Sequence, residues 1–250
     1  MVVLHLTDLH ASPAREADLR ARWCALAEAL DALPEGWRPD GAAITGDLVC
    51  TAAPAELALA ERYLGALLCR LRLPAERVAC CPGNHDGPAD VNGGVTFSGF
   101  DALLARMGFA AGRMRAAGQS FACVNTCRRA GGAWFDRAAL AAEETARPLA
   151  PGTVLLLHHP PERVADRAAL ERFAGDGCLL LSGHTHAPRP VLAAFGTGWS
   201  LNGCAVSPNG ADEPWGCQLV RLEGGRLTAV LGLVSASQTK INIRFEEIFP

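Results

Sequence analysis

The stretch "RVACCPGNHD" (residues 77–86) places three chemically capable residues shortly after a short apolar run. The apolar part, residues 77–81, has the length and composition of a buried strand. It ends at Gly83-Asn84-His85-Asp86, which supplies an amide, an imidazole and a carboxylate. These side chains bind metal ions and move protons. The stretch therefore predicts a strand whose carboxyl end carries a functional site.

Two earlier stretches follow the same order of strand, polar motif and helix. Residues 2–7 ("VVLHLT") and 41–45 ("GAAIT") read as buried strands, and leucines at steps of three and four predict helices over 13–33 and 54–71. Three such units favour parallel strands joined by crossover helices. Ligands bind at the carboxyl ends of strands in sheets of this kind, so the motifs should share one edge.

The rest of the chain continues this order and then changes. Beyond residue 190 the helical period disappears, and strand-like runs separated by Gly-rich turns predict antiparallel strands of a second sheet over about 195–250. Neither an internal repeat nor a linker interrupts the pattern, so we expect one domain over residues 1–250. Before residue 190, strands are expected at 119–126, 153–157 and 177–182 and a helix at 136–147.

Composition excludes several classes of function. The 250 residues are 50% hydrophobic, yet no apolar run approaches the ~20 residues of a membrane span, and we expect a cytoplasmic protein without membrane contact. A net charge of −3 without long runs of one sign argues against binding of extended nucleic acid. Lys240 is the only lysine, which excludes a P-loop. The ten scattered cysteines predict reduced thiols, not a disulfide framework or zinc ribbon.

Polar sets follow five of the expected strands, and His5 is the only one of the seven histidines outside them. Carboxylates, imidazoles and an amide form a mixed nitrogen and oxygen ligand set that suits Mn, Fe, Zn, Ni or Co. The donors are too many for one ion, so we expect two. Asp8, His10 and His186 would hold the first ion, Asn84, His158 and His184 the second, and Asp47 would bridge them.

The order of motifs D-x-H, G-D, G-N-H-D, H and G-H-x-H resembles the calcineurin-like metallophosphoesterase superfamily, from residue 1 to about 210. Within it, "HHPP" and "GNHD" are most similar to bacterial relatives of the class III cyclic-nucleotide phosphodiesterases. The resemblance implies a four-layer α-β-β-α sandwich, in which two facing mixed β-sheets are flanked by helices. It also implies the same division of metal ligands and attack on phosphorus by a hydroxide that bridges the two metals.

The resemblance further assigns roles beyond the metals. It implies that His85 contacts the phosphate and protonates the departing oxygen. Asp86 would then hold the imidazole of His85 in orientation. We expect His159 to be either a pocket wall or a hydrogen-bond donor that supports a ligand, His5 to be a hydrogen-bonded core residue, and Arg129 to be solvated surface. The Gly-rich loop 87–96 would form a rim of the site.

The expected activity is hydrolysis of a small or flexible, cyclic-nucleotide-like phosphodiester. Alternatives are a phosphomonoesterase or protein phosphatase, a nuclease like the DNA-repair branch of the superfamily, and a non-catalytic scaffold like its retromer subunit. The scaffold is disfavoured because all seven expected ligands and His85 are present. The strand-like tail, residues 238–250, either completes a sheet or pairs with a second subunit in a homodimer.

Overall fold

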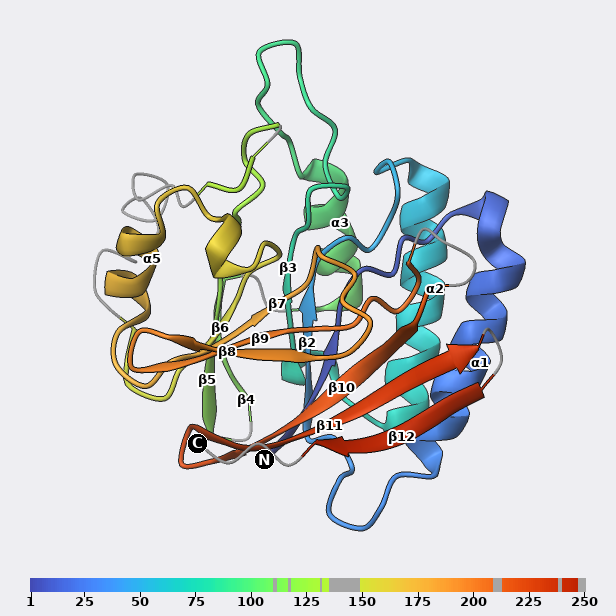
Figure 1. The fold of residues 1–250 in the computed structure, drawn as a ribbon. Helices are drawn as coiled ribbons and strands as arrows, with labels where there is room; N and C mark the ends of the chain where they lie inside the picture. The colour runs from blue at the N-terminus through green and yellow to red at the C-terminus, as the bar shows by residue number, and fades with distance from the viewer. Residues whose placement is uncertain are drawn as a thin grey trace.

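Two six-stranded sheets face each other and carry helices on their outer faces (Figure 1), which confirms the four-layer α-β-β-α sandwich. The computed structural model describes residues 1–109, 112–116, 118–130, 132–134, 149–208, 213–237 and 240–246. The helix expected over residues 136–147 lies outside the described residues.

The first sheet has the strand order β12-β11-β10-β1-β2-β3. Its three N-terminal strands are parallel, as the repeated strand, motif and helix order predicts. The prediction that the C-terminal strands belong to a second sheet is wrong for β10 to β12, because β10 pairs antiparallel with β1. The strands are β1 (Val2–Leu6), β2 (Gly41–Thr45), β3 (Val78–Cys81), β10 (Trp215–Glu223), β11 (Arg226–Ser237) and β12 (Lys240–Glu246).

The second sheet has the order β4-β5-β6-β7-β9-β8. Strands β5, β6, β7 and β9 are parallel, while the edge strands β4 and β8 run antiparallel to their neighbours. β9 is therefore parallel to β7, although the sequence pattern favoured only antiparallel strands after residue 195. The strands are β4 (Arg113–Ala116), β5 (Gln119–Cys123), β6 (Val154–Leu156), β7 (Leu179–Ser182), β8 (Val191–Phe195) and β9 (Gly198–Asn202).

Helices cover the outer face of each sheet. The first expected helix begins as a 3-10 turn, Pro13–Arg15, and continues as an α-helix. The second begins at its proline and ends where Arg72 adopts a left-handed conformation, with φ 55°. The helices are α1 (Glu16–Asp31), α2 (Pro54–Leu71) and α3 (Ser98–Met107) against the first sheet, α5 (Arg167–Ala174) against the second, and the 3-10 turns Ala75–Arg77 and Pro161–Arg163.

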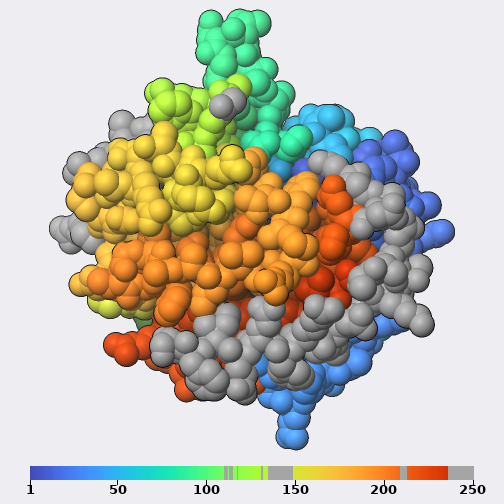
Figure 2. Space-filling view, in the orientation of Figure 1, coloured from blue at the N-terminus to red at the C-terminus, as the bar shows by residue number. Residues whose placement is uncertain are grey.

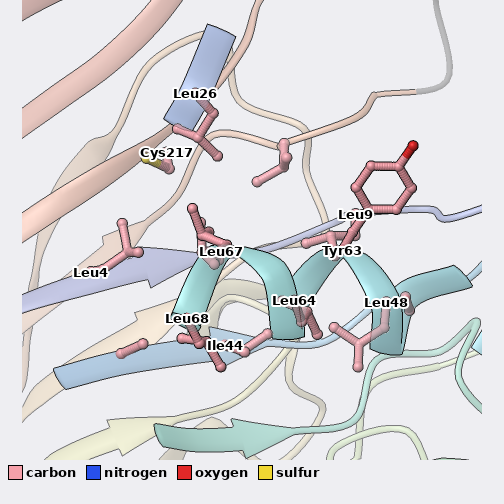
Figure 3. Packing of buried hydrophobic residues seen from close by; sticks show 14 of the residues in the cluster. Leu4, Leu9, Leu26, Ile44, Leu48, Tyr63, Leu64, Leu67, Leu68 and Cys217 are labelled. Atoms are coloured by element: carbon pink, nitrogen blue, oxygen red, sulfur yellow. The ribbon is translucent and has the colours of Figure 1, made fainter. Parts of the chain in front are cut away.

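Three clusters of buried apolar residues fill the spaces between the four layers. Leu4 and Ile44 point from the first sheet toward Leu64 and Leu67 of α2 (Figure 3). Alternate residues of the same strands, such as Val3, face the second sheet. A third cluster lies between the second sheet and α5. Both faces of β1 are therefore buried, which explains why four of its five residues are apolar.

The loop of residues 87–96 projects from the molecule next to the segment 128–130 (Figures 1 and 2). Backbone hydrogen bonds join them, from Val95 to the carbonyl of Arg128 at 3.1 Å and from Ala130 to that of Gly93 at 2.8 Å. This pairing gives the loop a defined position beside the carboxyl ends of the strands.

Candidate metal centre

The loops after β1, β2, β3, β6 and β7 meet at one end of the facing sheets, and they carry every expected ligand. Five of these ligands adopt left-handed backbone conformations, which cost a non-glycine residue roughly 1–3 kcal/mol each. Such strain persists only where the surrounding structure demands it, and here it turns the side chains toward a common point. The five are Asp8 (φ 54°), His10 (φ 43°), Asp47 (φ 52°), His184 (φ 72°) and His186 (φ 48°).

Asp8, His10 and His186 form the first group of candidate ligands. The Nε2 atoms of His10 and His186 lie 3.0 Å apart. Oδ2 of Asp8 accepts hydrogen bonds from the Thr7 hydroxyl at 2.7 Å and the His184 amide at 3.0 Å. Its Oδ1 is buried without a hydrogen-bond partner and faces His186 Nε2 at 3.4 Å and His10 Nε2 at 3.8 Å. One oxygen therefore holds the carboxylate in place and the other is left to bind a cation.

Asn84, His158 and His184 form the second group. His158 Nδ1 donates to the carbonyl of Thr45 at 2.8 Å, which leaves Nε2 to face the other ligands. That Nε2 lies 3.0 Å from Asn84 Oδ1 and 3.2 Å from His184 Nδ1. Asn84 Oδ1 and His184 Nδ1 are 3.1 Å apart. The three atoms form a compact triangle opening toward Asp47.

Asp47 stands between the two groups. Its Oδ2 lies 3.2 Å from His158 Nε2 and 3.8 Å from His10 Nε2, so one oxygen faces a member of each group. Its Oδ1 accepts a hydrogen bond from the backbone amide of His85 at 2.9 Å. This arrangement suits a carboxylate that is shared by two ions.

The electrostatics of the two groups favour a cation between them. Burial alone would raise the pKa of the Asp47 carboxyl, but His158 and His10 hold it well below its usual range. Burial alone would lower the pKa of His158, whereas Asp47 raises it to about 9. Burial lowers the pKa of both His10 and His184, which keeps these imidazoles neutral at neutral pH. Neutral imidazoles and an ionised carboxylate are the forms that bind metal, so His158 has to release its proton when a metal ion binds beside Asp47.

The residues present fit two metal ions. Nitrogen and oxygen ligands about 2.0–2.2 Å from one ion lie roughly 3.0–3.5 Å apart in octahedral and tetrahedral geometry. The separations within the second group, 3.0 to 3.2 Å, fall in this range. In the first group, Oδ1 of Asp8 is buried and accepts no hydrogen bond, so this oxygen is free to bind a cation. A mixed set without thiolates suits Mn, Fe, Zn, Ni or Co.

His85 lies at the mouth of the centre and is partly exposed. Its Nδ1 donates to the carbonyl of Cys50 at 2.7 Å. One of its ring nitrogens is within 4.8 Å of ligand atoms of His10 and Asp47. The bond to Cys50 fixes the ring and leaves Nε2 for a substrate.

The role expected for Asp86 is corrected by its contacts. Its carboxylate is buried and accepts three backbone hydrogen bonds, from Leu48 at 2.7 Å, Val49 at 3.2 Å and Gly83 at 2.8 Å. It therefore ties the loop after β2 to the loop after β3 and does not orient the ring of His85, which the Cys50 carbonyl holds instead. Neighbouring residues in a tight turn point in different directions, so adjacency in sequence was misleading.

The backbone at Gly83 lies so close to Asp47, the carboxylate between the two groups, that only glycine fits at this position. A Cβ at this position would lie 2.1 Å from Asp47 Oδ1 and 2.2 Å from the Asp47 backbone nitrogen. A side chain here would displace the carboxylate that faces both groups. The glycine thus allows the loops after β2 and β3 to pack together under the centre.

A pocket of about 480 Å³ opens beside the second group, and Asn84 and His184 form part of its wall. His159 also lines it, as the sequence predicts, and its Nδ1 lies 2.9 Å from the hydroxyl of Thr126. Burial and the imidazoles of His158 and His184 lower the pKa of His159 to about 3, so this ring is neutral. Sequence reasoning missed Thr126 because 33 residues separate it from its partner.

The fold is a four-layer α-β-β-α sandwich, and one end of its sheets gathers groups of histidine and aspartate that could hold metal ions. Residues 1–188 match the family model "Calcineurin-like phosphoesterase", and the chain belongs to that family. This membership, together with the clusters of histidine and aspartate, supports a metal-dependent hydrolase that acts on phosphoester bonds. A comparison with curated protein sequences found no match.

Two solved structures from Thermus thermophilus share the fold at low sequence identity. A hypothetical protein from Thermus thermophilus is 16% identical, with a TM-score of 0.53 and coverage of 94% of this chain and 99% of that one. The sulfate thiohydrolase SoxB from Thermus thermophilus is also 16% identical, with a TM-score of 0.53 and coverage of 97% of this chain and 58% of that one. The phosphoesterase Yfce from E. coli is 15% identical, with a TM-score of 0.46 and coverages of 97% and 96%.

Within the described part of the chain, none of the helices combines the length and the apolar character needed to cross a membrane.

Proposed function

We propose that this chain is a binuclear metal-dependent phosphodiesterase that acts on a small or flexible phosphodiester. The observation that carries the proposal is the position of Asp47, whose Oδ2 faces His158 Nε2 at 3.2 Å and His10 Nε2 at 3.8 Å. A carboxylate so placed can serve two ions at once. The proposed first set is Asp8, His10 and His186, and the proposed second set is Asn84, His158 and His184.

Two bound ions would supply Lewis acidity at the phosphoryl oxygens and lower the pKa of a water molecule. The protein would supply the fixed positions of the ligands and a proton donor. His85 is suited to donate because its Nδ1–H is engaged by the carbonyl of Cys50, so Nε2 is the atom that can exchange a proton with a leaving oxygen.

The pocket beside Asn84 and His184 supports a substrate with a group beyond the reacting phosphate. Its volume, about 480 Å³, lies in the range of sites for small ligands. A simple monoester would leave much of this space empty, whereas a diester carries a second substituent that can fill it. Similarity to class III cyclic-nucleotide phosphodiesterases in the "GNHD" and "HHPP" motifs supports the same choice.

The proposal is tested by metal analysis and a small substrate panel. Purified protein is reconstituted with Mn²⁺, and its metal content and its turnover of bis-p-nitrophenyl phosphate, p-nitrophenyl phosphate and cyclic AMP are measured. We expect two metal ions per chain and faster turnover of a diester than of the monoester. A preference for p-nitrophenyl phosphate would favour a phosphomonoesterase. A reconstituted protein that hydrolyses none of the three would refute the proposal.

A further inference from the structure

Two arginines line the pocket beside the second group of candidate ligands. Arg129 and Arg163 both belong to its wall, together with Asn84 and His184 from the candidate metal centre. The wall of this pocket contains no aspartate or glutamate among the described residues. The pocket wall therefore carries two formal positive charges and no negative one, although the chain as a whole carries a net charge of −3.

The segments that carry the two arginines are joined to each other by the backbone. Ala165 donates to the carbonyl of Ala133 at 3.0 Å, and Trp134 donates to that of Thr126 at 3.0 Å. These bonds connect the 3-10 turn that ends at Arg163 with the segment that follows Arg129. Backbone pairing thus joins the two segments of the pocket wall that carry the arginines.

Both guanidinium groups are available for a ligand. Arg129 and Arg163 are exposed, and neither forms an ion pair with a carboxylate in the part of the chain that the structure describes. The Arg129 guanidinium carbon lies 5.4 Å from the ring centre of Trp134, a contact that favours one orientation of the side chain.

We infer that Arg129 and Arg163 bind a second phosphate group of the substrate, so that the enzyme prefers a phosphodiester that also carries a terminal phosphate. The inference rests on the proposed phosphodiesterase function and names the class of substrate for the same site. Guanidinium groups bind phosphate through paired N–H donors. The described wall of the pocket has no carboxylate that would repel a phosphate. The reacting phosphate would lie at the metals and the second phosphate at the arginines.

The inference is tested with two chromogenic substrates that differ by one phosphate. These are thymidine 3′-(4-nitrophenyl phosphate) and the same compound with a 5′-phosphate, used with the Mn²⁺-reconstituted protein. We expect the 5′-phosphate to raise kcat/KM at least about tenfold, mainly through KM. The measured quantity is the ratio of kcat/KM with the 5′-phosphate to kcat/KM without it. Arg129→Gln and Arg163→Gln should each reduce this ratio, and the double variant should bring it close to one.

Arg172→Gln is the matched control. Arg172 is an exposed arginine of α5 outside the pocket wall, so its loss changes the net charge equally without touching the pocket. The ratio should stay at the wild-type value in this variant. A wild-type ratio of one, or an unchanged ratio in the double variant, would overturn the inference. An equal fall in the control would mean that general electrostatic attraction is responsible, which also overturns it.

Failure of the proposed function would look different. If bis-p-nitrophenyl phosphate is hydrolysed but the ratio is one, only the second phosphate site is refuted. If none of the diesters is hydrolysed, the phosphodiesterase proposal fails, and calorimetric titration with thymidine 5′-monophosphate and thymidine 3′,5′-bisphosphate decides on the pocket. Tighter binding of the bisphosphate that depends on both arginines would support it, and equal binding would refute it.

Discussion

The carboxylate of Asp47 accepts a hydrogen bond from the backbone amide of His85 through Oδ1, at an N–O distance of 2.9 Å. The other oxygen of the same carboxylate faces His10 and His158. Asp47 thus joins the candidate metal centre to the backbone of the candidate proton donor. Movement of this carboxylate would alter metal binding and the position of His85 together.

The first prediction concerns the charge of Asp47. Asp47→Asn keeps the size of the side chain but removes the negative charge shared by the two groups of ligands. We expect the metal content to fall from two ions per chain to one or fewer, and turnover to fall by more than about a hundredfold. Elemental analysis and the rate on bis-p-nitrophenyl phosphate measure both. Asp18→Asn, at an exposed position of α1, is the control and should change neither. Full activity in Asp47→Asn would refute the bridging role.

The second prediction separates His85 from the metal ligands. His85→Gln should leave two ions bound, because the ligand atoms of both groups remain. Loss of a general acid should slow turnover by roughly 10²–10⁴-fold. The effect should grow as the leaving group becomes less acidic, which is measured with a series of aryl and alkyl esters. Equal slowing of all esters would show that His85 does not protonate the leaving oxygen.

The third prediction tests the corrected role of Asp86. Asp86→Asn replaces one acceptor oxygen by a donor amide opposite backbone N–H groups, so at least one of the three hydrogen bonds is lost. We expect the free energy of unfolding to fall by about 1–3 kcal/mol, measured with urea. The dependence of the rate on the leaving group should stay as in the wild type. A variant of full stability with the leaving-group pattern of His85→Gln would instead restore the orienting role.

The sequence indicated the candidate ligands because each one closely follows a strand, and parallel strands end at the same edge. It could not indicate the partners of the C-terminal strands. In β10, Leu219 faces the helices and Val220 faces the second sheet, an alternation that predicts a strand with two buried faces but not its neighbour. Its pairing with β1, more than 200 residues earlier, depends on how the two sheets close around their common core.

Contacts made by single side chains were predicted less well. The bond between His85 and the Cys50 carbonyl spans 35 residues and uses a backbone atom, so no residue type in the sequence signals it. Arg163 lies in the segment between two motifs and was not distinguished from surface arginines. Its place in the pocket follows from the pairing of residues 133 and 164, which a pattern of hydrophobicity does not reveal.

The fourth prediction uses the close approach at Gly83. Gly83→Ala adds a Cβ that would meet Oδ1 of Asp47 at 2.1 Å, so this carboxylate must move. We expect loss of bound metal and of activity, in a chain that is also less stable. Gly65→Ala is the control, because a Cβ at Gly65 in α2 meets nothing within 4 Å. That variant should gain about 0.4–1 kcal/mol of stability and keep its metals, since alanine favours the helix. Retention of two ions in Gly83→Ala would contradict the packing described above.

The last prediction concerns His5, which is buried between the sheets. Its Nε2 lies 2.9 Å from the Thr45 hydroxyl and its Nδ1 lies 2.5 Å from Gln218 Nε2. Burial lowers the pKa of His5 from 6.5 to about 3, with the charge of Asp8 opposing the shift. The folded protein therefore keeps this imidazole neutral, while the unfolded chain takes up a proton below pH 6.5. The stability that depends on neutral His5 is complete above pH 6.5 and is lost as the pH falls toward 3.

His5→Gln removes this one titration and can still form hydrogen bonds. Between pH 7.5 and 5.5 the metal-free wild type should lose about 1.4 kcal/mol more free energy of unfolding than the variant, as measured by urea denaturation with a chelator. Between pH 8.5 and 7.5 the two proteins should change equally, because His5 is neutral in both the folded and the unfolded chain. Parallel pH profiles from 7.5 to 5.5 would mean that His5 takes up its proton in the folded protein as readily as in the unfolded one.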